Sequence, residues 1–144
     1  RNAHGVVAFR FKFRRMFMKI YIGHSNDWDY KNKLYKPILN SKLSEKHEII
    51  FPHINNESFN TKEVIKTSDL FIAEVSRPSL GLGIEIGRAE QIGKRILCIY
   101  EEGQKCSSSL KYVNVTVITY KGAIDMVNKI ESEINKIENQ NGSE

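Results

Sequence analysis

Glu85 is the residue whose type and position most directly suggest chemistry. It lies in the first turn of an expected helix, near residues 81–93, and follows a glycine-rich segment. On a helical wheel Ala89 lies about 40° and Leu82 about 60° from Glu85, so the carboxylate leaves the apolar face of the helix. A carboxylate on that side costs several kcal/mol unless it is hydrogen-bonded, which favours a functional site. The alternative is an ion pair with Arg88 on the helix surface.

The segment before Glu85 is a glycine-rich turn between an expected strand and an expected helix. Residues 76–87 read Ser-Arg-Pro-Ser-Leu-Gly-Leu-Gly-Ile-Glu-Ile-Gly. Ile86 stands where a dinucleotide-binding fingerprint has its third glycine, and the turn has no Gly-Lys-Ser/Thr of a P-loop. The exposed N–H groups and the dipole of the helix still favour an anion at such a turn. Gly81 and Gly83 are therefore candidate ligand-binding residues.

Strand and helix patterns alternate along the chain. Five short apolar runs are typical of strands: Lys19–Gly23, Glu48–Phe51, Leu70–Val75, Arg95–Tyr100 and Val113–Tyr120. Helical patterns cover about Asp29–Leu43, Lys62–Thr67, Gly81–Gly93 and Ala123–Ile137. Pro37 predicts a kink or an early break in the first of these helices, and Asn60 with Glu63 is spaced for reciprocal capping of the second.

This alternation predicts an α/β domain of the flavodoxin-like, doubly wound class. Strands that alternate with helices are parallel, and right-handed crossovers place helices on both faces of the sheet. Five strands fit the order 2-1-3-4-5 better than the six-stranded dinucleotide fold. Ligands bind beyond the carboxyl ends of such strands, between the first and third. The candidate loops are therefore residues 23–29 and 76–83.

The positive charge does not indicate a protein that binds a nucleic-acid polymer. The net charge is +5, but residues 1–17 hold five bases and no acid, and the rest of the chain has 17 of each. The basic surface that a phosphate-backbone binder needs is thus missing from the expected fold. We predict a basic N-terminal extension outside the fold at 1–17, a domain at 18–138 and a polar tail at 139–144. A basic arm that contacts a membrane or RNA is the alternative for the extension.

Length and composition limit the remaining classes of protein. The chain has 144 residues, enough for one domain, and no apolar run approaches the roughly 18 residues needed to span a bilayer. Its two cysteines do not form a disulfide framework, which favours a reducing, cytoplasmic setting. The four histidines and two cysteines lack metal-ligand spacing, so we predict no metal and no cofactor.

The run Ile-Ala-Glu-Val-Ser-Arg-Pro-Ser-Leu-Gly-Leu-Gly-Ile-Glu-Ile-Gly-Arg-Ala at 72–89, continued by residues 93–98, resembles a known signature. It is similar to the core of the nucleoside 2-deoxyribosyltransferase superfamily, and most similar to its 2'-deoxynucleoside 5'-monophosphate N-glycosidases. The resemblance implies that Glu85 is a nucleophile that attacks the anomeric carbon of a 2-deoxyribosyl group. At the position of Ser79 the transferases have aspartate and the monophosphate hydrolases serine, which implies a phosphate-bearing substrate.

The expected chemistry needs orientation more than activation, because a glutamate is already ionised at neutral pH. A carboxylate below the anomeric carbon can stabilise an oxocarbenium-like state and then bond to it. We expect a hydroxyl to hold the carboxylate or the sugar, and Tyr21 and Ser25 match the family pattern of a tyrosine and a serine around the first loop. The alternatives are that Tyr21 is an ordinary strand residue and that Ser25 is a helix cap.

Two positions depart from the family pattern. Thr61 stands where the family has an aspartate that manages the proton of the leaving base. The glycine pair and arginine that the hydrolases have in the first loop are replaced here by His24, Asn26, Asp27 and Trp28. We therefore consider Asp27, Asp29 or His24 for the departing base, with a plain loop role as the alternative for His24. The substrate-binding candidates are Tyr21, Gly23, His24, Ser25, Asp27, Ser79, Gly81 and Gly83.

The sequence predicts an enzyme that cleaves or transfers the N-glycosidic bond of a deoxynucleoside or deoxynucleoside 5'-monophosphate. The alternative is a nucleotide-binding or sensing module of the same fold with little or no catalysis. The expected partner is a small nucleoside or nucleotide, and neither a nucleic-acid polymer nor a membrane is expected. The resemblance also implies a homodimer or larger homo-oligomer.

Overall fold

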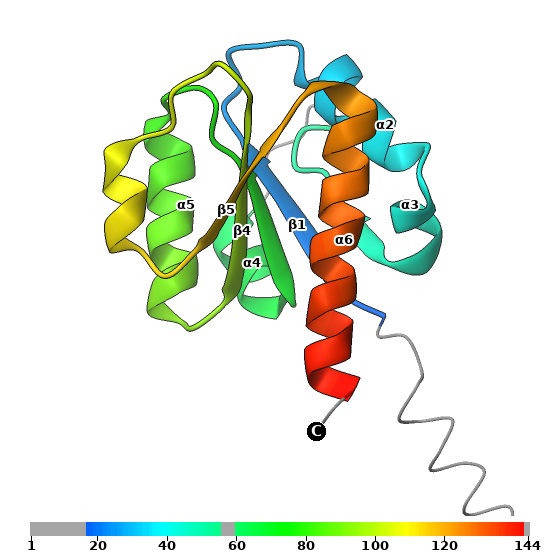
Figure 1. Ribbon diagram of the computed structural model, residues 1–144. Coiled ribbons are helices and arrows are strands. Elements are labelled where there is room, and N and C mark those ends of the chain that lie inside the picture. The colour runs from blue at the N-terminus through cyan, green and yellow to red at the C-terminus, as the bar shows by residue number, and fades with distance from the viewer. Residues whose placement is uncertain (1–16, 56–59, 143–144) are drawn as a thin grey trace, which may run out of the picture.

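The computed structural model describes residues 17–55 and 60–142 and shows one parallel sheet between two layers of helices (Figure 1). The strands are β1 (Lys19–His24), β2 (Glu48–Ile50), β3 (Leu70–Glu74), β4 (Arg95–Glu101) and β5 (Thr116–Tyr120). They lie in the order β2-β1-β3-β4-β5, and every neighbouring pair is parallel, which confirms the predicted fold class. The loops after β1 and β3 leave the same edge of the sheet at the point where the strand order reverses.

Each face of the sheet has its own hydrophobic core. On one face pack the π-helical turn η1 (Lys31–Tyr35) and the helices α2 (Lys36–Leu39), α3 (Lys42–Lys46) and α6 (Gly122–Gly142). On the other pack α4 (Thr61–Thr67), α5 (Leu80–Gln91) and the 3₁₀ turn η2 (Ser108–Tyr112). Within the described ranges, no helix has both the length and the apolar character that crossing a membrane requires.

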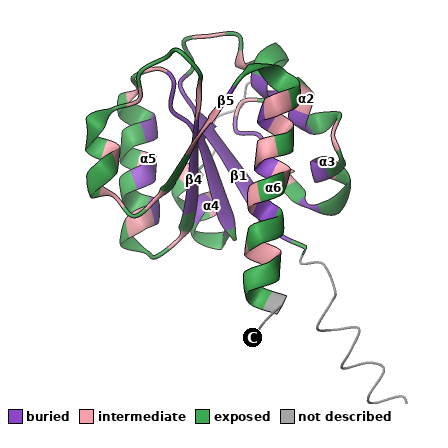
Figure 2. Cartoon of the chain, in the orientation of Figure 1, coloured by how far each residue is buried: buried purple, intermediate pink, exposed green. Residues whose placement is uncertain are grey.

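Successive side chains of β1 point to opposite faces of the sheet, so neighbouring residues of this strand belong to different hydrophobic cores. Ile20 and Ile22 join the core under α2 and α6, whereas Tyr21 joins the core under α4 and α5. Figure 2 shows β1 and β4 buried along most of their length, with buried and exposed residues alternating on the helices. A strand covered on both faces explains why β1 reads as a nearly continuous apolar run.

The first helix differs from the prediction of one segment over residues 29–43. Pro37 has no N–H to donate, and it lies in the first turn of α2, directly after the wider π-helical turn. The helix ends at Leu39, and Ser41 then separates it from α3. The Ser41 hydroxyl donates to the Ile38 carbonyl at 2.6 Å and accepts the Leu43 N–H at 3.2 Å. These two hydrogen bonds of Ser41 end one helix and begin the next.

Other boundaries were only partly predicted. The capping prediction for α4 is confirmed on its asparagine side, where Asn60 Oδ1 accepts the Glu63 N–H at 3.4 Å. The predicted strand over residues 113–120 begins only at Thr116, because η2 occupies the chain up to Tyr112. The last helix runs to Gly142 rather than Ile137, so it includes four residues of the segment predicted as a polar tail. Residues 1–16 of the predicted extension lie outside the described residues.

A buried carboxylate fixes the loop that follows β3. Glu74 is 1% exposed, and its oxygens accept the Ser76 N–H at 2.9 Å, the Ser76 hydroxyl at 2.7 Å and the Tyr120 hydroxyl. The Ser76 Oγ in turn accepts the Glu101 N–H at 2.8 Å. Three strand ends are thereby tied together directly below the glycine-rich turn, which compensates the cost of burying the carboxylate.

We predict that Tyr120→Phe lowers the free energy of unfolding by about 1–3 kcal/mol, because the buried Glu74 carboxylate loses one of its donors. Urea denaturation measures the difference. Tyr112→Phe is the control, because this tyrosine is 82% exposed and its replacement should change stability by less than about 0.5 kcal/mol. Equal stability of the two variants would contradict the role given to the Glu74 cluster.

Candidate active site

Three elements converge on the Glu85 carboxylate. Tyr21 of β1 donates its hydroxyl to Glu85 Oε2 at 3.2 Å. The Thr61 side chain, at the start of α4, lies near enough to the Glu85 carboxylate to lower its pKa. Glu85 itself is partly buried in the second turn of α5, on the side of the helix that faces these two residues. The structure thus brings Tyr21, one of the predicted site residues, to the predicted nucleophile.

The electrostatics of this trio leave Glu85 as the acceptor and Tyr21 as the donor. Burial raises the pKa of Glu85, while the hydrogen bonds from Tyr21 and Thr61 and the charge of Arg88 lower it. Burial, and next the Glu85 carboxylate, raise the pKa of Tyr21, so its hydroxyl stays protonated. The ion pair with Arg88 that the sequence offered as the alternative is not formed among the described residues, and the charge of Arg88 is the smallest of the three influences that lower the pKa of Glu85.

Gly23 lies on the same face of β1 as Tyr21, and packing accounts for its lack of a side chain. A Cβ at Gly23 would lie 2.5 Å from Phe71 Cε1 and 3.0 Å from Leu82 Cδ1. These side chains fill the space beside the glycine, so α5 can approach the sheet closely there. The substrate-binding role predicted for Gly23 stays a prediction, and its packing role is what the structure shows.

His24 lies on the opposite face of β1 and does not match the proton-donor hypothesis. Its Nδ1 is 2.8 Å from the Ser25 carbonyl oxygen, and its Nε2 lies against the Tyr35 hydroxyl. The Tyr35 oxygen accepts the His53 N–H at 3.1 Å, which leaves the tyrosine proton for His24 Nε2. Burial lowers the pKa of His24 to about 4. A neutral ring with both nitrogens occupied argues against the hypothesis that His24 gives a proton to the base, and that role stays an untested prediction.

Ser25 and Asp27 shape the first loop. The Ser25 Oγ accepts the Asp27 N–H at 3.2 Å, and the Ser25 carbonyl accepts the Trp28 indole N–H at 2.9 Å. Ser25 is buried, whereas the Asp27 side chain is exposed. Neither residue contacts Glu85 in the structure, so their contribution to substrate binding stays a prediction.

The start of α5 presents the remaining predicted residues. Ser79 caps the helix, with its Oγ accepting the Leu82 N–H at 3.2 Å, and its hydroxyl hydrogen can still be donated. No atom lies within 4 Å of a Cβ placed on Gly81 or on Gly83. The open space beside both glycines permits a ligand or another chain to approach the backbone closely.

Contacts between distant loops add residues that the sequence did not predict. Arg77, in the loop after β3, lies over the Trp28 ring of the first loop, 4.2 Å from the ring centroid. The ring of His53, after β2, contacts the rings of His24 and Tyr30, and the His53 backbone N–H donates to the Tyr35 hydroxyl. No local pattern marks such pairs, because the partners are far apart in the sequence. Among the residues described, no group of three or more histidine, cysteine or acidic side chains could hold a metal ion.

The chain is similar in sequence to curated N-hydrolases. The chain is 37% identical over 73 residues to the 5-hydroxymethyl-dUMP N-hydrolase of Danio rerio, covering 49% of each protein. It is 47% identical over 49 residues to the protein of that name in Branchiostoma floridae, covering 33% of this chain and 47% of the relative. The chain thus spans about half the length of these curated relatives. No family model matches the chain.

The solved structures agree with the sequence comparison. The CMP N-glycosidase of Clostridium botulinum superposes with a TM-score of 0.59 and 27% identity, covering 78% of this chain and 98% of that one. These relatives confirm the predicted resemblance to the nucleoside 2-deoxyribosyltransferase superfamily and its N-hydrolase branch.

We predict that Tyr21→Phe raises the pKa of Glu85 further, because it removes a hydrogen bond that stabilises the charged carboxylate. Carboxyl NMR titration should place the wild-type midpoint above the ordinary value of 4.5 and the variant midpoint higher still. Tyr112→Phe, far from the carboxylate, should leave the midpoint unchanged. A midpoint that stays or falls in Tyr21→Phe would show that the hydroxyl does not stabilise the charge.

Proposed function

We propose that this chain cleaves the N-glycosidic bond of a deoxynucleoside 5'-monophosphate, with Glu85 as the nucleophile. The observation that carries the proposal is the partly buried Glu85 carboxylate, which accepts the Tyr21 hydroxyl at 3.2 Å and lies beside Thr61. The names of the relatives, which are N-hydrolases and an N-glycosidase, support the same bond as the point of attack.

The reaction proceeds in two steps. An oxygen of ionised Glu85 bonds to the anomeric carbon while the carbon–nitrogen bond breaks and its electron pair leaves with the base. Water then attacks the anomeric carbon, the ester bond opens, and its electron pair returns to the carboxylate. The proton that the attacking water loses goes to solvent and replaces the one that the departing base took from it. The products are the free base and 2-deoxyribose 5-phosphate. A second base that attacks in place of water gives base exchange and loses its N–H proton.

The departing base takes its proton from water. The groups that act on Glu85 in the described part of the chain are two neutral hydroxyls and the Arg88 cation, and none of them is a carboxylic acid. His24 is excluded by its low pKa and occupied nitrogens. Asp27 and Asp29 are exposed and make no contact with the trio. A side-chain acid would add about 10²–10⁴ in rate, so turnover is expected to be slow.

Tyr21 and Thr61 serve to orient the carboxylate. The Tyr21 hydroxyl occupies one lone pair of the carboxylate and reduces the rotational freedom of the side chain, and the carboxylate keeps further lone pairs for the anomeric carbon. Ser79 lies six residues before Glu85 on the same helix, which corresponds to about 9 Å along the axis. Its hydroxyl can therefore contact another part of a nucleotide whose sugar lies at Glu85.

We expect Glu85→Gln to reduce release of base from deoxynucleoside 5'-monophosphates by about 10³-fold or more, because the amide cannot form the glycosyl ester. Chromatography of free base measures the rate. Glu90→Gln is the matched control on the same helix, because its carboxylate accepts the Asn114 N–H at 2.7 Å instead of facing the trio. Saturable nucleotide binding without base release would instead identify a binding module.

The assembly expected from the resemblance is a homodimer or larger homo-oligomer, and exposed residues of α5 support it. Leu80 is 84% exposed and Ile84, one turn later, is 47% exposed, next to the open space at Gly83. Apolar side chains one turn apart form a patch that a second chain could cover. The patch adjoins the proposed site.

We predict that Ile84→Glu shifts the protein toward the monomer, because it places a charge in the middle of the proposed interface. Analytical ultracentrifugation measures the mass in solution. Ile124→Glu is the control, since Ile124 is 81% exposed on α6, away from α5. A wild-type protein that is already monomeric at assay concentration would refute the proposed assembly.

A further inference from the structure

Arg77 has a guanidinium nitrogen that lacks a partner. Its Nη1 is buried and has no hydrogen-bond partner. Among the described residues, no other buried side-chain nitrogen or oxygen lacks a partner. The guanidinium lies over the Trp28 ring at 4.2 Å from the centroid, so the indole fixes its plane. A buried cationic donor without an acceptor is costly, which suggests that an acceptor is supplied by a ligand.

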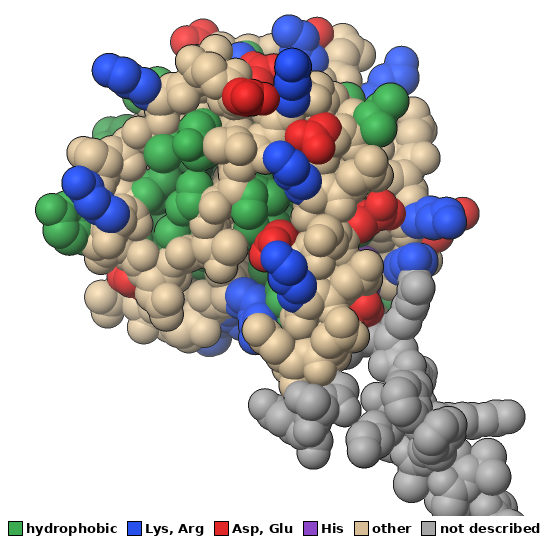
Figure 3. All heavy atoms as spheres, viewed as in Figure 1, with side chains coloured by type: hydrophobic (Ala, Val, Ile, Leu, Met, Phe, Trp, Pro, Cys, Tyr) green, Lys and Arg blue, Asp and Glu red, His purple; other side chains and the backbone are tan. Residues whose placement is uncertain are grey.

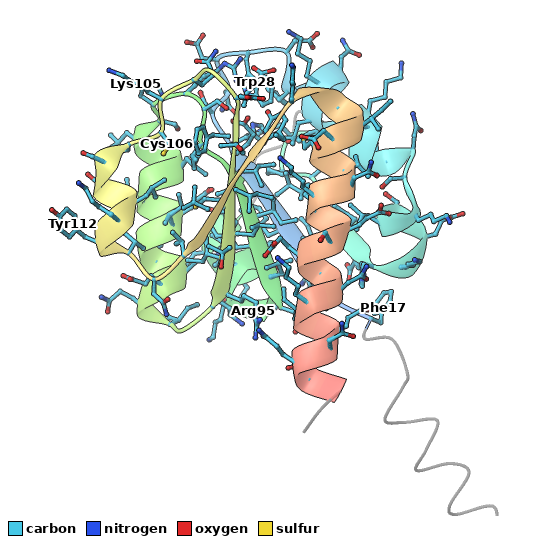
Figure 4. The ribbon with its side chains drawn as sticks, viewed as in Figure 1. Phe17, Trp28, Arg95, Lys105, Cys106 and Tyr112 are labelled. Atoms are coloured by element: carbon cyan, nitrogen blue, oxygen red, sulfur yellow. The ribbon has the colours of Figure 1, made fainter. Side chains whose placement is uncertain are left out.

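A cavity of about 620 Å³ adjoins this guanidinium, between the first half of α5 and residues 105–113. Its polar lining, beside apolar side chains, consists of two cations and three serines: Arg77, Lys105, Ser79, Ser107 and Ser109. The described lining includes no carboxylate. Figure 3 shows hydrophobic side chains gathered over α5 and η2, and Figure 4 shows Trp28, Lys105 and Cys106 at the carboxyl edge of the sheet. Two cations and several hydroxyls beside an apolar wall favour an anion that carries an organic group.

Several features make a phosphate group the best match. A guanidinium presents its N–H groups as a planar fork that fits two phosphate oxygens. Stacking on Trp28 restricts rotation of the fork before any ligand binds, which reduces the entropy lost on binding. Trp28 is itself held in place by its N–H bond to the Ser25 carbonyl at 2.9 Å. The first loop thus contributes a ring that orients Arg77, and Arg77 supplies the charge.

We propose that Arg77 binds the phosphate of the substrate and sets the preference for a nucleotide over a nucleoside. This inference rests on the proposed function, because it places the phosphate near Arg77 and Ser79 while the sugar lies at Glu85. Arg77 and Ser79 are two residues apart in the loop that ends at the start of α5, and both line the same cavity. Lys105 faces that cavity from the segment after β4 and adds a second positive charge.

Equilibrium binding tests the proposal without depending on turnover. Calorimetric titrations use the full chain with Glu85→Gln, so that the substrate stays intact, and three probes: a 2'-deoxynucleoside 5'-monophosphate, the matching 2'-deoxynucleoside and inorganic phosphate. Arg77→Gln should weaken binding of the monophosphate by about tenfold to a hundredfold and leave the affinity for the nucleoside unchanged. Arg77→Lys should recover part of this loss, since it keeps the charge without the fork. Trp28→Leu should give a smaller loss than Arg77→Gln.

Arg95→Gln is the matched control for the loss of one positive charge. Arg95 lies at the opposite end of the sheet, where its Nη1 donates to Gln140 Oε1 at 3.1 Å (Figure 4). Weaker inorganic phosphate binding in Arg77→Gln but not in Arg95→Gln supports a phosphate site even if the chain releases no base. Equal monophosphate affinities of Arg77→Gln and Arg95→Gln, an equal loss for nucleoside and monophosphate, or no binding of either phosphate probe would overturn the proposal.

Discussion

The partial burial of the Glu85 carboxylate is the constraint on which the site depends. A carboxylate between the sheet and the solvent loses hydration, and its pKa rises unless donors replace the lost water. Tyr21 and Thr61 supply such donors from β1 and α4, so the position of both elements relative to α5 matters. Close packing at Gly23 against Phe71 and Leu82 brings α5 near enough to the sheet for the Tyr21 hydroxyl to reach the carboxylate.

The alternation of side chains along β1 divides the neighbourhood into two chemically different sides. Tyr21 faces α5 and the carboxylate, whereas His24 faces Tyr35 and the aromatic rings near His53. The His24 imidazole thus lies across the sheet from the Glu85 carboxylate. His24 and Ser25 therefore hold the first loop in its conformation. Among the described residues of this loop, Trp28 contacts Arg77 in the loop after β3.

Local patterns predicted much of this arrangement and missed the parts that depend on long-range contacts. The alternation of strands and helices gave the strand order, and the wheel position of Glu85 gave its inward direction, because both follow from periodicity. The position of His24 opposite Tyr21 follows from strand parity, because the two residues are three apart on β1. The stacking of Arg77 on Trp28 was inaccessible, since it joins two loops whose shapes are fixed by Ser25 and by the Glu74 cluster.

Two glutamates of the same strand–turn–helix segment show why burial alone does not identify the carboxylate that can react. Glu74 is the more buried, yet its oxygens accept bonds from Ser76 and Tyr120, and no free side faces a cavity. Glu85 is less buried and accepts a hydrogen bond from the Tyr21 hydroxyl. A nucleophile needs lone pairs directed at open space, and a structural carboxylate needs them all occupied. Glu74 thus holds the turn in place, and Glu85, eleven residues later, can react because its coordination is incomplete.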